Sequence, residues 1–181
     1  MKETIIINLF GSPCSGKSTC AAYLFSKFKL EGINCELVTE YAKDMVYEGN
    51  NTALSDQIYV FGHQHFRISK LIGKVDVIIT DAPLENSIFY NSNEDIAESF
   101  ERLVWDIATQ YRTVNVFLER IGTYEQSGRL QTEYESNKMS DELYQLFEDY
   151  LDWDTDKYFL ATDKGYNTIC EIMSDKFPTE L

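Results

Sequence analysis

The residues best suited to chemistry stand near the N-terminus, where two glycines enclose a short loop that ends in lysine and serine. Gly11, Gly16, Lys17 and Ser18 fit the pattern G-x-x-x-x-G-K-[ST]. In such a loop, backbone N–H groups converge on phosphate oxygens, the lysine reaches the β- and γ-phosphates, and the serine hydroxyl is a ligand for Mg²⁺. The pattern therefore predicts binding of ATP or GTP with Mg²⁺. The residues assigned to phosphate binding are Gly11, Ser12, Pro13, Cys14, Ser15, Gly16, Lys17, Ser18 and Thr19.

The sequence on either side of the loop supplies the two elements that must position it. Residues 4–10 (TIIINLF) are a continuous apolar and β-branched run, which is typical of a strand buried on both faces. Residues 18–30 carry apolar side chains at helical spacing and are followed by Gly32. A strand that enters the loop and a helix that leaves it favour phosphate binding, because the helix adds its N-terminal dipole.

Two acidic residues follow predicted strands at 34–39 and 75–80, namely Glu40 and Asp81. Ligands of an open parallel sheet lie outside the carboxyl ends of its strands, so both carboxylates are expected near the phosphate loop. Phosphoryl transfer uses one carboxylate to accept or orient the proton of the attacking hydroxyl and another beside Mg²⁺. We assign Glu40 to the acceptor hydroxyl, and Asp81 with Ser18 to the metal. The exchanged assignment of the two acids stays open.

A polar segment of poor periodicity, residues 120–139, contains Arg120 and Arg129. Mobile arginines can neutralise charge on a transferred phosphoryl group while water is excluded. We predict a short lid over these residues, with both arginines in catalytic roles. The competing interpretation is a set of surface ion pairs with Glu125, Glu133 and Glu135, each worth less than ~1 kcal/mol.

A predicted helix over residues 55–71 carries polar side chains beside aromatic ones. We predict that Gln64 and Arg67 contact the acceptor, together with Glu40 and Tyr41. The ring of Tyr41 can stack on a base, although packing in the core or on the surface is the competing interpretation. His63 and His65 alone do not make a metal site.

Strand and helix patterns alternate along the chain. This alternation predicts an α/β fold of the P-loop NTPase class, with a five-stranded parallel sheet and helices on both faces. No linker or repeat divides residues 1–181, so we expect a single domain. The remaining predicted strands are 113–118 and 157–161, and the remaining predicted helices are 40–47, 93–110, 140–151 and 166–177.

The composition describes a folded chain with an acidic surface. The 181 residues carry a formal net charge of −14, are 44% hydrophobic and 14% aromatic. The charge counts against a general nucleic-acid-binding surface, though not against a local basic groove. Four cysteines without a CxxC pair indicate reduced thiols. No apolar run reaches the ~18–20 residues of a membrane span, so we expect a cytoplasmic protein without a membrane partner.

Several segments together resemble small P-loop kinases of the nicotinamide-riboside-kinase-like ATPase group, which includes many bacteriophage nucleotide-kinase-like proteins. The resemblance implies a sheet with the Asp81 strand beside the P-loop strand, a mobile lid, and phosphate transfer from ATP·Mg²⁺ to a hydroxyl. It also implies the cytoplasm of the host if a phage encodes the chain. The segments are the P-loop, residues 39–42 (TEYA), Gln57 with Gln64 and Arg67, residues 80–84 (TDAPL), and residues 120–133 with Arg120, Tyr124 and Arg129.

The leading hypothesis is an ATP-dependent kinase for a small nucleoside- or nucleotide-like acceptor. A kinase acting on hydroxymethylated pyrimidines or the ends of DNA is the second hypothesis, since relatives of this kind include such enzymes. A nucleotide-dependent switch that binds a partner is the third. The absence of an N-K-x-D motif from the sequence disfavours GTP. The acceptor and the oligomeric state are left open by the sequence.

Overall fold

The computed structural model describes residues 3–120, 123–125 and 131–148, and the backbone of residues 159–160. Its strands pair in the order β2-β3-β1-β4-β5, and every pairing is parallel. Four longer strands form most of the sheet, and β5 adds two residues at the β4 edge. The strands are β1 (Ile5–Phe10), β2 (Cys35–Val38), β3 (Val77–Thr80), β4 (Arg112–Glu119) and β5 (Phe159–Leu160).

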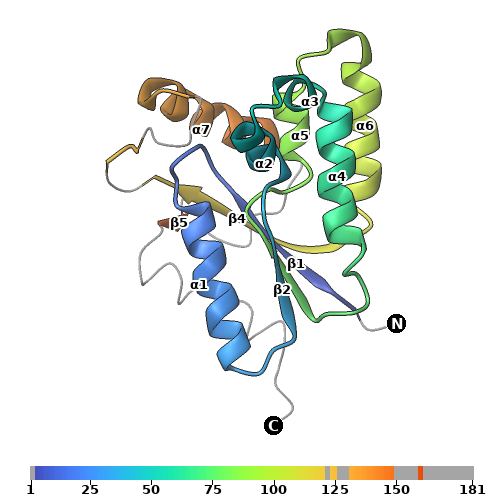
Figure 1. The fold of residues 1–181 in the computed structure, drawn as a ribbon, viewed down its shortest axis with the longest axis vertical. Helices are drawn as coiled ribbons and strands as arrows, with labels where there is room; N and C mark the ends of the chain where they lie inside the picture. Colours follow the sequence, from blue (N-terminus) through green and yellow to red (C-terminus); the bar gives the residue numbers. More distant parts are fainter. Residues whose placement is uncertain (1–2, 121–122, 126–130, 149–158, 161–181) are drawn as a thin grey trace.

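The predicted α/β architecture is confirmed, because helices cover both faces of this parallel sheet (Figure 1). Figure 1 shows α1 on one side of the sheet and α4 and α6 on the other. No helix among the described residues is both long and apolar enough to cross a membrane. The helices are α1 (Lys17–Leu30), α2 (Tyr41–Glu48), α3 (Asn51–Ser55), α4 (Gln57–Ser69), α5 (Asn86–Tyr90), the 3₁₀ turn η1 (Glu94–Ile96), α6 (Ala97–Ala108) and α7 (Glu133–Glu148).

The side chains of β1 alternate between two cores, as the two-residue period of a strand requires. Ile5, Ile7 and Leu9 pack with the buried face of α1. Ile6 packs in the opposite direction, with residues of α4 and α6 such as Phe61. Because both faces are covered, the central strand is buried throughout its length and is apolar apart from Asn8, whose side-chain amide donates to Oδ1 of Asn115 at 3.1 Å.

The order of the strands places the two sequence motifs side by side. β3 pairs directly with β1 in parallel register, with Asn8 opposite Thr80. The phosphate loop leaves the carboxyl end of β1, and Asp81 leaves the carboxyl end of β3. The neighbouring position of the Asp81 strand, which the resemblance implied, is confirmed.

Two predicted helices are divided. Residues 55–71 form the end of α3 and then α4, and the N-cap of α4 is Asp56, whose carboxylate accepts hydrogen bonds from the N–H groups of Ile58 and Tyr59. The helix predicted to begin at residue 55 therefore begins at Gln57. Residues 93–110 form η1 followed by α6. The short helix α5 has no counterpart among the sequence predictions.

The helix predicted at 140–151 needs a larger correction, because α7 begins at Glu133 and not at residue 140. Thr132 and Glu135 form a capping box: the Glu135 carboxylate accepts from the Thr132 N–H at 2.6 Å, and the Glu135 N–H donates to the Thr132 hydroxyl at 3.3 Å. The last part of segment 120–139 is therefore helix. Arg129 and the predicted terminal helix at 166–177 lie outside the described residues.

Candidate active site

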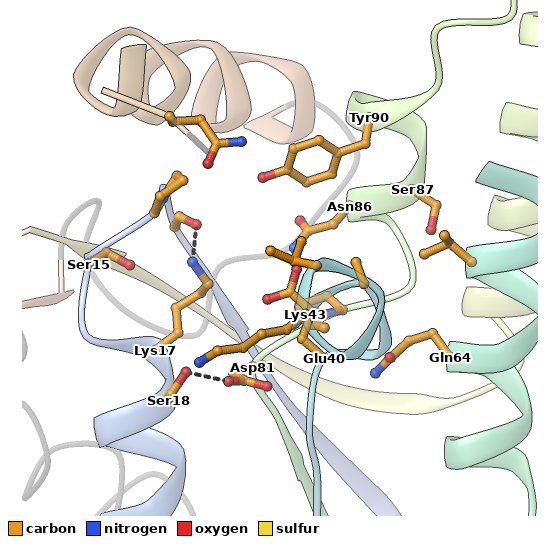
Figure 2. A pocket seen from close by; sticks show the side chains of 18 of the residues that line it. Ser15, Lys17, Ser18, Glu40, Lys43, Gln64, Asp81, Asn86, Ser87 and Tyr90 are labelled. Carbon is orange, nitrogen blue, oxygen red and sulfur yellow. Dashed lines mark hydrogen bonds between the residues drawn. The ribbon is translucent and has the colours of Figure 1, made fainter. Parts of the chain in front are cut away.

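A cavity of about 420 Å³ lies where β1, β2 and β3 end (Figure 2). It brings together the phosphate loop after β1, Glu40 after β2 and Asp81 after β3. Gln64 of α4 lines the same cavity. Every predicted phosphate-loop residue is part of the lining except Ser12, whose side chain is buried behind the loop.

The backbone of the phosphate loop requires glycine at its first position. Gly11 has a φ of 137°, and a Cβ atom there would lie 2.4 Å from the carbonyl oxygen of Leu118 in β4. Gly16, with a φ of 88°, is the N-cap of α1. Lys17 is the first residue of that helix, and its ammonium group donates to the carbonyl oxygens of Gly11 and Ser12 at 2.6 Å and 2.9 Å. The loop thus leads into the N-terminus of α1, where a lysine stands, and this is the arrangement that phosphate binding needs.

Ser18 and Asp81 form a pair on the floor of the cavity. The Ser18 hydroxyl donates to Oδ2 of Asp81 at 2.6 Å. Asp81 is 5% exposed, and its other oxygen, Oδ1, accepts no hydrogen bond from the part of the chain that the structure describes. A hydroxyl and a carboxylate with a spare buried oxygen fit the oxygen ligands that Mg²⁺ prefers. Within those residues no group of three His, Cys, Asp or Glu side chains gathers as an alternative metal site.

Glu40 lies at the N-cap of α2 with its side chain directed into the cavity (Figure 2). Its carboxylate makes no capping hydrogen bond, so it does not serve the helix. Burial raises the pKa of Glu40, the positive charge of Lys17 opposes this, and the negative charge of Asp81 adds to it. A carboxylate with a raised pKa is a stronger base than an exposed one, which suits proton abstraction from a hydroxyl.

The structure separates the other predicted acceptor residues. Gln64 is 4% exposed, and its side-chain carbonyl oxygen accepts from the Tyr41 N–H at 2.9 Å. The NH₂ group of its amide, at Nε2, is therefore left to bind an acceptor. That amine is buried without a hydrogen-bond partner among the described residues. Tyr41 and Arg67 do not line the cavity. Arg67 pairs with Asp44 and lies over the Tyr41 ring.

The cavity also contains side chains that the sequence analysis did not single out. α5 contributes Asn86, Ser87 and Tyr90, and α2 contributes Lys43 (Figure 2). Oδ1 of Asn86 is buried without a hydrogen-bond partner in the described part of the chain. Burial and then the charge of Glu40 raise the pKa of Tyr90, which places its hydroxyl in the same electrostatic environment as the Glu40 carboxylate. Helix α5 has only five residues, too few for a helical period to be detected.

Arg120 is directed at α7 and does not line the cavity. It forms a salt bridge with Glu133 at 2.8 Å, hydrogen bonds to Asn137, and lies 5.6 Å from the centre of the Tyr124 ring. In this conformation the ion-pair interpretation of the sequence holds for Arg120. The second predicted arginine, Arg129, lies outside the described residues.

Helix α7 is attached to the phosphate loop by one buried side chain. Ser136 is fully buried, and its hydroxyl donates to the carbonyl oxygen of Pro13 at 2.6 Å. The same hydroxyl lies 3.3 Å from that of Ser12. Helix α7, which begins within the segment predicted to form a lid, is thus linked to the phosphate loop.

Solved structures of similar fold are P-loop kinases. The chain matches the NadR protein in complex with NR with a TM-score of 0.72 and 16% identity, over 98% of this chain and 53% of that one, so it spans about half of that chain's length. It matches a deoxyadenosine kinase from M. mycoides with bound dATP with a TM-score of 0.61 and 17% identity, over 93% and 98%. It matches a thymidylate kinase from Ehrlichia chaffeensis with a TM-score of 0.57 and 13% identity, over 95% and 99%.

At these identities the similarity shows the fold. The fold is the α/β fold of P-loop kinases, with a parallel sheet, and the candidate site lies at the carboxyl ends of its strands. No protein-family model and no curated protein sequence matches the chain.

Proposed function

We propose that this chain is an ATP-dependent kinase that transfers the γ-phosphate to a hydroxyl group of a nucleoside-like acceptor. The observation that carries the proposal is that three features meet in one cavity. They are the phosphate loop, the Ser18–Asp81 pair and the Glu40 carboxylate, which makes no hydrogen bond to the N-terminus of α2. A protein that only binds nucleotide needs the first of these features. A kinase needs all three and space beside them for the acceptor.

The nucleotide side of the cavity is built from the loop and α1. Backbone N–H groups at the start of α1 face the phosphates, and Lys17 exchanges its loop carbonyl partners for phosphate oxygens. Ser18 and Asp81 would hold Mg²⁺, which when bound neutralises phosphate charge. The similarity in fold to a deoxyadenosine kinase whose structure contains dATP supports a purine nucleoside triphosphate here.

The reaction proceeds by in-line displacement. The acceptor oxygen forms a bond to the γ-phosphorus, and the bond from that phosphorus to the β–γ bridging oxygen breaks with its electron pair left on ADP. The hydroxyl proton passes to Glu40, whose raised pKa prepares it to accept the proton. The part of the cavity lined by Gln64 then binds the rest of the acceptor and keeps its hydroxyl in line with the γ-phosphate.

The acceptor side offers an apolar slot with polar groups at fixed points. Val46, Leu54 and Val60 line it together with the amine of Gln64 and the side chain of Asn86. The buried Gln64 amine and Asn86 oxygen each cost about 1–3 kcal/mol if they stay without a partner. A flat ring with hydrogen-bonding groups at its edge, such as a nucleobase, satisfies both conditions. In this arrangement Tyr41 acts through Gln64, because the Tyr41 N–H fixes the orientation of its amide, and Arg67 lies over the Tyr41 ring.

A coupled assay of ADP release tests the proposal. The wild-type protein with ATP·Mg²⁺ is offered nucleosides, nucleoside monophosphates, nicotinamide riboside and DNA that contains hydroxymethyluracil. We expect one class of small acceptor to accelerate ADP release, and the K17M variant to lose that acceleration. Lys74 is exposed and does not line the cavity, so K74M is the matched control.

The outcomes of this assay separate the three hypotheses. Acceleration by the DNA alone would replace the small acceptor with a polynucleotide. Slow ADP release that no acceptor changes would contradict the kinase proposal and favour a nucleotide-dependent switch. Acceleration that survives in K17M would show that the activity does not belong to this site.

A further inference from the structure

Helix α2 presents an unassigned lysine to the cavity. Lys43 lies one turn after Glu40, and it shares the cavity-lining face of α2 with Ala42, Val46 and Tyr47. These positions recur at the spacing of one helix face, whereas Tyr41 and Met45 are buried in the core behind it. The orientation of α2 about its axis therefore directs the Lys43 side chain into the cavity.

Among the residues that the structure describes, Lys43 is the cation on the acceptor side of the cavity. Of the described residues that line the cavity, only Lys17 and Lys43 carry a positive charge, and Lys17 belongs to the phosphate loop. Two arginines close to the site are engaged elsewhere: Arg67 pairs with Asp44, and Arg120 pairs with Glu133. Within the described ranges, no salt bridge or hydrogen bond occupies the Lys43 ammonium group.

The two carboxylates that line the cavity favour a positive charge beside a bound phosphoryl group. The carboxylates of Glu40 and Asp81 both face the position of the transferred phosphoryl group, and their charges repel the negative charge on its equatorial oxygens. In Figure 2 the Lys43 side chain extends from α2 toward the Ser18–Asp81 pair. The charge of Lys43 also lowers the pKa of Glu40 against the effect of burial, which places the lysine within electrostatic reach of the proposed base.

We propose that Lys43 is a catalytic residue that contacts the equatorial oxygens of the transferred phosphoryl group from the acceptor side. The proposal rests on the proposed kinase function. While the acceptor oxygen bonds to phosphorus and the bridging oxygen leaves with ADP, Lys43 keeps its proton, and the hydroxyl proton goes to Glu40. Lys43 thus supplies from within the fold the positive charge that we had expected from arginines in a lid.

Nucleotide binding with a phosphoryl mimic tests this role without an acceptor. Aluminium fluoride with ADP·Mg²⁺ imitates the planar, charged phosphoryl group in transfer. The measurements are the Kd of ADP·Mg²⁺ with and without aluminium fluoride for wild type, K43M, K43R and the distant control K74M. We expect aluminium fluoride to tighten ADP binding in wild type and K74M, and the tightening to fall about tenfold or more in K43M. K43R, which keeps the charge, should retain most of it, and ADP alone should bind equally to all four.

Four results would overturn the proposal. They are equal tightening in K43M and wild type, no tightening in wild type, equal loss in K43R and K43M, and a matching loss of affinity for ADP alone. The first two results would mean that Lys43 does not contact the phosphoryl group. The third would mean that its charge is not what matters, and the fourth would mean that Lys43 contributes to binding of ADP itself. The kinase proposal fails separately, when no acceptor accelerates ADP release, and the binding comparison does not depend on that result.

Discussion

The candidate site holds two carboxylates in different surroundings, and this difference separates their proposed roles. Asp81 accepts a hydrogen bond from the Ser18 hydroxyl at 2.6 Å. Glu40 makes no capping bond, and burial raises its pKa. Neighbouring carboxyl groups with different environments are how one site holds both a base and a charged ligand at the same pH. We therefore propose Glu40 as the base and Asp81 as the metal-side residue.

Replacing Glu40 with glutamine tests this division. If Glu40 is the base, E40Q lowers kcat for the acceptor found in the ADP-release assay by about 10²–10⁴-fold. In wild type, kcat/KM should fall as the pH drops through the pKa of Glu40, which burial raises above the ordinary value of 4.5. The expected acid limb therefore lies above pH 4.5 and is absent from E40Q.

The matched control is E48Q, at the exposed end of the same helix. It should keep the wild-type rate and the wild-type pH profile. An unchanged acid limb in E40Q would assign the titration to another group and remove Glu40 from the role of base.

The sequence predicted the residues that follow strands better than the residues on helices. Glu40 and Asp81 come just after β2 and β3, whose ends converge in any parallel sheet, and both line the cavity. Lys17 also lines it, and although it is the first residue of α1 it is identified by the phosphate-loop motif and not by a helical period. Tyr41 and Arg67 lie on helices, and small differences in the phase of α2 and α4 decide which side chains enter the cavity. Lys43 lines the cavity for the same reason. No periodicity in eight residues of α2 specifies that phase with enough precision.

At the scale of elements, α7 joins the predicted lid to the phosphate loop. The helix starts in a capping box between Thr132 and Glu135, and one residue later Ser136 donates to the loop carbonyl of Pro13. Hydrogen bonds from Thr132 lower the pKa of Glu135, so its carboxylate stays charged near neutral pH. The start of α7 and the position of the loop are therefore linked.

Thr132→Ala tests the contribution of this cap. Loss of an N-cap hydroxyl costs about 1 kcal/mol, so T132A should lower the free energy of unfolding by about that amount in urea titrations. Because the cap precedes Ser136, the variant should also weaken binding of ADP·Mg²⁺. The control is T52A in α3, where the exposed threonine side chain caps nothing and alanine favours helix. Equal stability of T132A and wild type would show that packing alone fixes the start of α7.

The sequence contains a signal for this start, although the helix predicted from periodicity begins only at residue 140. Thr132 and Glu135 have the T-x-x-E spacing of a capping box, but the first turn of α7 is polar and gives no apolar period. The apolar residues that pack, Leu143, Tyr144 and Phe147, all lie in its second half. Helical periodicity was therefore visible only there, and the polar first half was assigned to a lid.

At the scale of the whole molecule, the fold buries one carboxyl group that the proposed reaction does not use. Glu85 is 3% exposed, at the N-cap of α5, beside a small cavity lined by residues of β1, α4 and α6 such as Ile6, Ile68 and Ala108. Burial raises the pKa of Glu85 to about 7, and its own backbone hydrogen bond opposes the shift only in part. The folded protein therefore favours the protonated carboxyl group.

This burial makes stability depend on pH in a defined direction. A carboxyl group with a pKa of about 7 in the fold and 4.5 in the unfolded chain contributes stability that is complete below pH 4.5 and is lost as the pH rises through about 7. A difference of this size corresponds to up to about 3 kcal/mol.

Glu85→Gln keeps the shape and cannot ionise, so E85Q should be more stable than wild type at pH 8 and close to it at pH 5. Urea unfolding of both proteins across this range measures the difference, with E98Q at an exposed position of α6 as the control. A pH-independent difference between E85Q and wild type would mean that Glu85 stays ionised in the fold and that its burial is compensated by a polar partner. The same curves decide whether the alkaline loss of stability belongs to Glu85 or to the general repulsion among the acidic residues that give the chain its charge of −14.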